Sequence, residues 1–213
     1  MRRRLSLIKR KIANVITSKP KSIALVGNGP SSQGFGEEID SHELVVRIST
    51  TPYYGKNGTR IDVLVILNWS DPGYRITTGI TPLNEQALNS AGEIWLPMAP
   101  EEMMVAKADQ ESPPPWPSYA DFSKDVISNF VRGRTCIRFP PSIWRDLTKQ
   151  LRLNGAEISH SASTGAVVLA YLRRAYPISN VFLYGFSHEG WPGHPWDAEA
   201  KWMQSLPKVT IRK

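Results

Sequence analysis

Two histidines lie in a loop rich in glycine and tryptophan, in the stretch YGFSHEGWPGHPWDAEAKW (184–202). Histidine is suited to take a proton from a hydroxyl because its ordinary pKa, about 6.5, lies near neutral pH. His194 is followed five residues later by Glu199, in a helix that we expect to begin near Asp197, so the carboxylate can reach back toward the loop. The loop follows an expected strand end near Gly185. It therefore offers His194 as a candidate acid–base group, although most loop histidines are simply exposed residues.

A glycine-rich turn follows the first expected strand, in VGNGPSSQGFG (26–36). Gly27, Gly29 and Ser32 approximate the pattern G-x-G-x-x-G, with serine in place of the third glycine. Glycines let a phosphate approach the backbone, and the start of a following helix supplies N–H donors. The turn alone is a weak signal for a nucleotide site.

The second expected strand argues against a dinucleotide ligand. A site for NAD expects an acidic residue about 20 positions after the glycines, at the end of that strand, to hold the ribose. Here the strand LVVRI (44–48) carries Arg47 and is followed by Ser49. NAD is therefore the less favoured ligand, and a Rossmann oxidoreductase is the weakest of the functions considered.

A second anion-ready helix start lies in ASTG (162–165). The hydroxyls of Ser163 and Thr164 and the backbone N–H groups near Gly165 could hold a carboxylate or a phosphate. Ser163 also suits the ordinary role of helix N-cap, which stabilises a helix by about 1 kcal/mol without any ligand. Two such helix starts beside strands favour a ligand with two acidic groups.

Metal and thiol chemistry have little support in the sequence. His188, Glu189, His194 and Asp197 lie close together, but their spacing matches no common zinc site, so we expect no metal. The single cysteine, Cys136, cannot form a disulfide within the chain and alternates within a likely strand, so we expect it to be a packing residue.

The order of the expected elements predicts an α/β fold of three layers around a mainly parallel sheet. Apolar runs predict strands at 22–26, 43–48, 61–67 and 181–184, with weaker candidates at 94–96 and 136–139. Helical spacing predicts helices at 121–131, 142–153 and 163–175. In such a fold ligands bind outside the carboxyl ends of the strands, which is where the three candidate blocks lie.

Charge and length divide the chain of 213 residues into a basic segment and a single domain. Residues 1–21 hold eight basic residues and no acid, which leaves 18 basic and 19 acidic residues for residues 22–213. A near-neutral body does not suit a nucleic-acid partner, which would need cations clustered on the fold. The basic segment has apolar residues at helical spacing, so it suits either an anionic membrane surface or a docked first helix.

Two further segments bear on organisation and location. Six prolines between residues 97 and 117 predict a long surface loop. The N-terminal segment has no apolar run of the kind found in a signal peptide, and no apolar stretch is long enough to span a bilayer. We therefore expect a cytoplasmic protein, with peripheral contact at the inner membrane face as one alternative.

Together, in this order, the three blocks resemble the sialyltransferases of glycosyltransferase family 29. VGNGPSSQGFGEEIDSHELVVRISTTP (26–52) looks like the large motif of that family, and SASTGAVVLAYLRRAYPISNVFLYGF (161–186) is similar to its small motif. His194 and Glu199 match the very small motif H-x-x-x-x-E, and His188 matches the histidine of the motif before it. The absence of the cysteine pair found in animal members favours a bacterial-type protein.

The resemblance implies a Rossmann-like fold of the GT-A-like variant and an inverting transfer, without a required metal or other cofactor. The donor would be a CMP-activated acidic sugar, either sialic acid or Kdo, and the acceptor a hydroxyl of a glycan or of a lipid-linked molecule, as in polysaccharide biosynthesis. His194 would be the general base, and His188 would assist the departing phosphate. The expected donor contacts are Asn28, Gly29, Pro30, Ser31, Ser49, Ser163, Thr164, Gly165, Gly185 and Phe186. A non-catalytic module that binds a nucleotide sugar is the alternative from another class.

Overall fold

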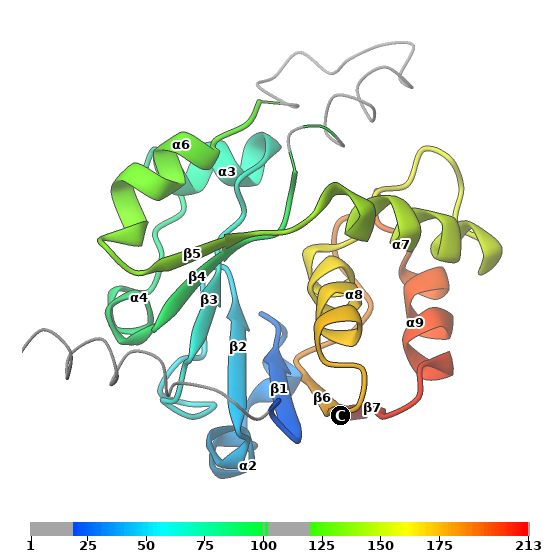
Figure 1. Ribbon diagram of the computed structural model, residues 1–213, viewed down its shortest axis with the longest axis horizontal. Helices are drawn as coiled ribbons and strands as arrows, with labels where there is room; N and C mark the ends of the chain where they lie inside the picture. The colour runs from blue at the N-terminus through cyan, green and yellow to red at the C-terminus, as the bar shows by residue number, and fades with distance from the viewer. Residues whose placement is uncertain (1–18, 100, 102–119, 213) are drawn as a thin grey trace, which may run out of the picture.

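The computed structural model describes residues 19–99, 101 and 120–212, and these residues form a sheet between two layers of helices (Figure 1). The seven strands run parallel in the order β5-β4-β3-β2-β1-β6-β7. They are β1 (Ser22–Val26), β2 (Leu44–Ile48), β3 (Val63–Val65), β4 (Glu93–Leu96), β5 (Thr135–Arg138), β6 (Asn180–Tyr184) and β7 (Val209–Arg212). The predicted α/β fold with a mainly parallel sheet is confirmed.

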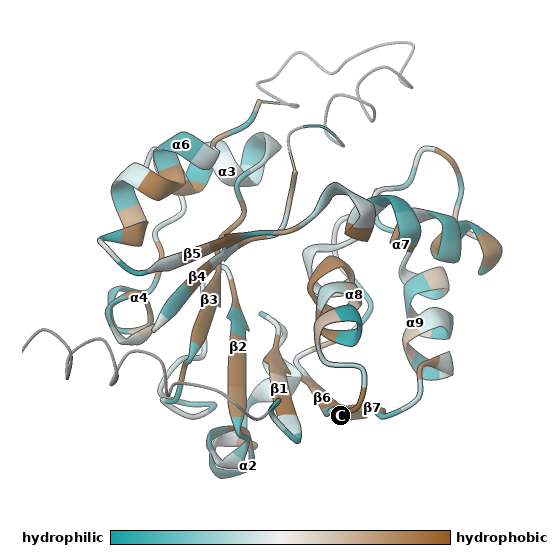
Figure 2. Cartoon of the chain, in the orientation of Figure 1, coloured by the Kyte–Doolittle hydropathy of each residue, from teal (hydrophilic) through white to brown (hydrophobic). Residues whose placement is uncertain are grey.

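Side chains of the strands alternate between apolar clusters on the two faces of the sheet, because successive residues of a strand point to opposite faces. On one face Ile23 and Leu25 of β1 pack with residues of α7 (Pro141–Leu153), α8 (Thr164–Ala175) and α9 (Trp196–Ser205). On the other face Leu64 and Ile66 pack with α3 (Ser70–Thr77), α4 (Glu85–Ser90) and α6 (Ser123–Val126). The central strands are accordingly largely apolar (Figure 2), although β2 also carries the buried Arg47.

The helices within and after the glycine turn are short. The turn contains η1 (Pro30–Ser32), a single 3-10 turn, and leads into α2 (Gly36–Ser41). Ile39 of α2 packs on Ala24, Val26 and Val45, which fixes this helix against β1 and β2. The turn and short helix expected between the first two strands are both present.

Most observed boundaries agree with those predicted from the sequence, with a few exceptions. The helix expected at 121–131 is α6 followed by η2 (Ile127–Val131), a π-helical turn. The third strand is only three residues long, although the apolar run around it continues. Three elements were not predicted: α3, which contains Pro72 and Gly73, the short α4, and the edge strand β7, none of whose residues is fully buried.

Two predicted features lie largely outside the described residues. Residues 1–18 of the basic segment are not described, and neither are residues 100 and 102–119 of the proline-rich stretch. Within the described part of the chain, no helix combines the length and the apolar composition that a bilayer crossing requires.

Candidate functional site

The chain changes direction along the sheet at the neighbouring strands β1 and β6. From β1 the strands proceed through β2 toward β5, whereas β6 and β7 lie on the opposite side of β1. Val26 and Tyr184 are the last residues of β1 and β6 and are paired in register. The loops that leave these two strands therefore border a topological switch point, which is the usual ligand site of an open α/β sheet. The glycine turn is one of these loops, and the histidine loop is the other.

The two loops are bonded to each other through their backbones. The N–H of Gly27 donates to the carbonyl of Tyr184 at 2.8 Å, and the N–H of Gly29 donates to the carbonyl of Gly185 at 3.2 Å. A Cβ at Gly29 would lie only 2.5 Å from the carbonyl oxygen of Gly185, and Gly185 itself has a φ of +73°. The close packing of the two loops therefore requires glycine at these positions. The interpretation of the sequence considered only the approach of a phosphate.

Phe186 joins these two loops to the start of α8. A Cβ at Gly27 would lie 3.4 Å from Cε2 of the Phe186 ring, and a Cβ at Gly165 would lie 2.6 Å from Cε1. The ring therefore lies against the backbones of both glycines. All three candidate blocks meet at this one side chain, although Gly27 and Phe186 are 159 positions apart in the sequence.

Glu199 holds the start of α8 from the side. Its carboxylate is fully buried and accepts two hydrogen bonds of 2.6 Å, from the backbone N–H and from the hydroxyl of Ser163. The hydroxyl of Ser163 in turn caps α8 by accepting from the N–H of Ala166. Burial raises the pKa of Glu199, and the bonds from Ser163 oppose that shift. The carboxylate reaches the small-motif block rather than its own loop, which the spacing of five residues did not reveal.

This arrangement limits what α8 can offer a ligand. Ser163 is engaged with Glu199 and with the first turn of the helix. Thr164 and Gly165 occupy the first helical positions, whose N–H groups have no partner inside a helix. Both residues are half-buried at the carboxyl edge of the sheet. Any anion at this helix start would therefore be held by Thr164 and Gly165.

His194 has a defined orientation. Its Nδ1 lies 2.7 Å from the carbonyl oxygen of Ser161, and a carbonyl can only accept, so Nδ1 carries the proton. In the neutral ring the lone pair is then on Nε2. Burial lowers the pKa of His194, the bond to Ser161 raises it, and the charge of His160 lowers it further, with a net decrease. The imidazole is therefore neutral at pH 7 and can accept a proton.

The loop of His194 is tied to the segment before α8 by a second bond. The N–H of Ser161 donates to the carbonyl of Gly193 at 2.9 Å. Together with the bond from His194 to Ser161, it places the predicted base beside the segment that leads into Ser163, Thr164 and Gly165. The expectation that the histidine and small-motif blocks lie together in space agrees with this geometry.

His160 is a candidate site residue that sequence reasoning missed. It is half-buried, its charge reaches His194, and its Nδ1 is buried without a hydrogen-bond partner among the described residues. The signal that could have found it is its position three residues before the N-cap Ser163. His188 lies in the same loop as His194, half-buried and with a φ of +54° that is uncommon for a non-glycine residue.

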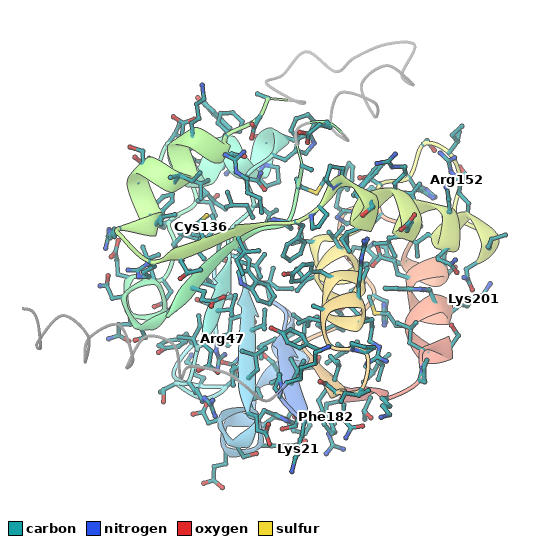
Figure 3. The ribbon with its side chains drawn as sticks, in the orientation of Figure 1. Lys21, Arg47, Cys136, Arg152, Phe182 and Lys201 are labelled. Carbon is teal, nitrogen blue, oxygen red and sulfur yellow. The ribbon has the colours of Figure 1, made fainter. Side chains whose placement is uncertain are left out.

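A series of buried, hydrogen-bonded polar side chains supports the glycine turn. Ser32 donates to the carbonyl of Gly29 at 3.0 Å and accepts from the side-chain amide of Asn57 at 2.9 Å. Arg47 lies on β2 (Figure 3), is 1% exposed, and donates to the side-chain oxygen of Asn57 at 2.7 Å. Arg47 thus supports the turn from inside the protein. In the turn itself, Asn28 and Pro30 are exposed and Ser31 is half-buried.

The end of β2 brings hydroxyls to the same edge. Ser49 and Thr51 are buried, and both have a left-handed backbone, with φ of +58° and +46°. The N–H of Ser49 donates to the carbonyl of Val65 at 2.7 Å. The hydroxyl of Thr51 is buried and has no hydrogen-bond partner among the described residues. Native proteins rarely leave such a group unpaired, so Thr51 is a second candidate that the sequence did not indicate.

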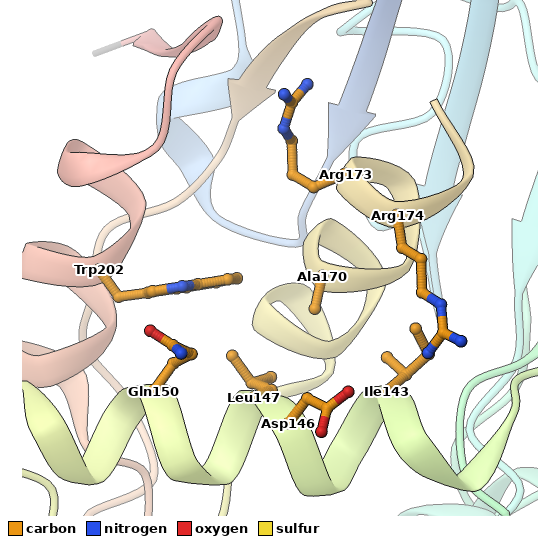
Figure 4. Close-up of a pocket in the computed structure, with 8 residues that line it drawn as sticks. All are labelled: Ile143, Asp146, Leu147, Gln150, Ala170, Arg173, Arg174 and Trp202. Carbon is orange, nitrogen blue, oxygen red and sulfur yellow. The ribbon is translucent and has the colours of Figure 1, made fainter. Parts of the chain in front are cut away.

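Two other features lie apart from this edge. A pocket of about 200 Å³ between α7, α8 and α9 is lined by Leu147, Ala170 and Trp202 among others, and none of the predicted site residues lines it (Figure 4). Cys136 lies on β5 at the far side of the sheet (Figure 3), where burial raises its pKa and disfavours the thiolate. No group of three or more His, Cys, Asp or Glu residues suited to a metal ion occurs in the described ranges.

Comparisons with known proteins agree on the fold. No family model matches the chain. A mammalian sialyltransferase superposes with a TM-score of 0.54 at 18% identity, over 97% of this chain and 78% of that one. A second mammalian sialyltransferase structure, in complex with Gal-beta-1-3GalNAc-ortho-nitrophenol, gives 0.52 at 19% identity, over 90% and 68%. CstII, a sialyltransferase of Campylobacter jejuni solved with the substrate analogue CMP-3FNeuAc, gives 0.55 at 12% identity, over 90% and 81%.

The chain therefore has the Rossmann-like α/β fold of the solved sialyltransferases. Among curated sequences it is similar to a urease operon 23 kDa accessory protein of Rhizobium meliloti, with 27% identity over 191 residues. This match covers 86% of the chain and 88% of that protein. The name of that relative states no reaction.

Proposed function

We propose that the chain is an inverting glycosyltransferase that moves an acidic sugar, sialic acid or Kdo, from a CMP-activated donor to a hydroxyl of a glycan or lipid-linked acceptor. The single observation that supports it most strongly is the position of His194. Its Nδ1 is fixed by Ser161, its Nε2 is left as a base, and it lies beside the start of α8 at the switch point of the sheet. The shared fold with sialyltransferases, one of them solved with a CMP-sugar analogue, supports the donor class.

In this proposal the donor lies across the two loops and the start of α8. Asn28, Gly29, Pro30 and Ser31 of the glycine turn contact the nucleotide, with Ser49 and Thr51 beside them at the end of β2. The N–H groups of Thr164 and Gly165 hold an acidic group of the donor, since the start of a helix favours negative charge. Ser163, Gly185 and Phe186 keep these parts in register through the contacts described above.

The reaction is a single displacement. Nε2 of His194 takes the proton of the acceptor hydroxyl as its oxygen attacks the anomeric carbon from the face opposite CMP. The bond from the anomeric carbon to the phosphate oxygen breaks, and its electron pair leaves with CMP, so the configuration inverts. His188 assists the departing phosphate, and His194 later returns its proton to solvent. No metal ion enters these steps, because the leaving group is a phosphate monoester that N–H groups and an imidazole can stabilise.

Binding and turnover separate this proposal from its alternatives. Titration calorimetry with CMP, UMP and NAD tests the ligand, and release of CMP from CMP-sialic acid and CMP-Kdo tests the chemistry. The proposal predicts CMP binding and release of CMP from one of the donors. A non-catalytic module would bind CMP without turnover, and an oxidoreductase would bind NAD and ignore CMP.

The proposal also places the enzyme in the cytoplasm, with residues 1–21 at an anionic membrane surface. The proposed membrane contact rests on the eight basic residues of this segment. Co-sedimentation with vesicles containing phosphatidylglycerol tests it, with a chain lacking residues 1–18 as the comparison. Equal sedimentation of the two chains would contradict the membrane contact.

A further inference from the structure

Trp191 is exposed to an extent that is unusual for its size. Its side chain is 61% exposed, whereas Trp95 and Trp202 are 1% and 6% exposed. An indole that is left in water does not gain the favourable free energy of burial. Exposed aromatic groups next to a site are commonly used for binding. Its position in the histidine loop relates this exposed surface to the proposed site.

The Trp191 ring packs against its own loop. Its six-membered ring lies over Gly193, where a Cβ would be 2.2 Å from Cη2. The carbonyl of Trp191 accepts hydrogen bonds from the N–H of His194 at 3.2 Å and from Nε1 of Trp196 at 3.1 Å. The ring therefore rests against Gly193, and 61% of the side chain is left exposed to a ligand.

The same ring adjoins the proposed base. The centroids of the Trp191 and His194 rings are 4.9 Å apart, and their planes are nearly perpendicular at 83°. Trp196 flanks His194 from another side at 5.0 Å and 79°. A flat group stacked on Trp191 would thus lie next to the imidazole that is to remove a proton.

A pyranose ring fits this surface. It has a face of C–H groups that can cover an indole and an edge of hydroxyls that can point at the neighbouring imidazole. We propose that Trp191 is the stacking platform for a pyranose of the acceptor and brings one of its hydroxyls to His194. This inference rests on the proposed function, and it narrows the acceptor to a carbohydrate hydroxyl rather than one carried by a lipid chain or a protein side chain.

Saturation-transfer NMR tests the platform without any catalysis. The probes are methyl β-galactoside and galactitol, an acyclic polyol that has similar hydroxyls but no ring face. We expect saturation of the galactoside ring protons with the wild-type protein, its loss in Trp191→Ala and partial retention in Trp191→Phe. Leu153→Ala, at a residue that is 80% exposed on α7, is the matched surface control and keeps the signal.

The CMP affinity of each variant, measured by calorimetry, shows whether the fold is intact. In the transfer assay the acceptor KM of Trp191→Ala should rise about tenfold. Saturation that is absent in the wild type, unchanged in Trp191→Ala, or as strong for galactitol would overturn the platform. A wild-type protein that does not bind CMP would instead contradict the proposed function, and the sugar signal would still report on Trp191 by itself.

Discussion

The carbonyl oxygen of Ser161 and Nδ1 of His194 lie 2.7 Å apart, and this bond fixes which nitrogen of the imidazole carries the proton. The residue that fixes it belongs to the segment leading into α8, 33 positions earlier in the chain. The proposed base and the proposed anion site are therefore positioned by the same few residues.

Substitution of the base should separate chemistry from binding. His194→Gln should lower the rate of sugar transfer by about 10²–10⁴-fold, because the transition state loses its proton acceptor. The CMP affinity should stay within about twofold of wild type, since the nucleotide is held by the other loop and by α8. Transfer assays and calorimetry on the same preparation check both parts. A variant that transfers sugar at the wild-type rate would remove His194 from the mechanism.

The position of the acid limb of the pH–rate profile should depend on the charge of His160. A general base must be neutral, so the rate falls as pH drops through the pKa of His194, which burial and the charge of His160 lower. His160→Gln removes that charge, so the pKa of His194 should rise and the acid limb should move to higher pH. NMR titration of the His194 ring protons measures the same shift without turnover. Glu157→Gln, an exposed charge change three residues away, is the control; a limb that stays in place in His160→Gln would contradict the coupling.

Loss of the Glu199 carboxylate should cost stability. Glu199→Ala leaves the buried N–H and hydroxyl of Ser163 without their acceptor, so the free energy of unfolding should fall by about 2–4 kcal/mol. Lys201→Ala, an exposed position on the same helix, should change it by less than about 0.5 kcal/mol. Urea unfolding followed by circular dichroism compares the two. Equal midpoints would mean that Ser163 does not depend on Glu199.

Thr51 should show opposite effects on stability and on binding. Thr51→Val keeps the volume and removes a buried hydroxyl that has no partner among the described residues, so the free protein should gain about 1 kcal/mol. If the hydroxyl contacts the donor, CMP affinity should fall about fivefold to tenfold. Thr50→Val, at the half-buried neighbour, is the control and should change neither quantity in this way. A destabilised Thr51→Val with unchanged CMP affinity would assign the hydroxyl to the fold alone.

The parts of the fold that the sequence predicts are those with a strong local pattern. The strand 22–26 is observed with those bounds, because a short apolar run ends at a glycine. The helix expected at 163–175 is observed as Thr164–Ala175, with Ser163 as its cap, because the cap, the apolar spacing and Pro177 all agree. The strand at 209–212 has no such pattern, because it lies at the sheet edge and its side chains are only partly buried or exposed.

The site could be predicted as a set of blocks but not as a set of contacts. The sequence indicates that the loops meet at the carboxyl edge, because parallel strands end there together. It does not indicate that Glu199 bonds to Ser163, or that Gly29 lies against Gly185, since these pairs are 36 and 156 positions apart. Thr51 was missed because nothing in its local sequence distinguishes it from an ordinary loop residue, and His160 because a position three residues before the N-cap Ser163 is only a weak signal.

A crystal structure of the protein with CMP tests the central claim most directly. The account predicts that the nucleotide lies between Asn28 and the start of α8, with its phosphate within hydrogen-bond distance of the N–H of Thr164 or Gly165 and with Nε2 of His194 facing it. CMP bound elsewhere, for example in the pocket beside Trp202, or no bound CMP at all, would contradict the account.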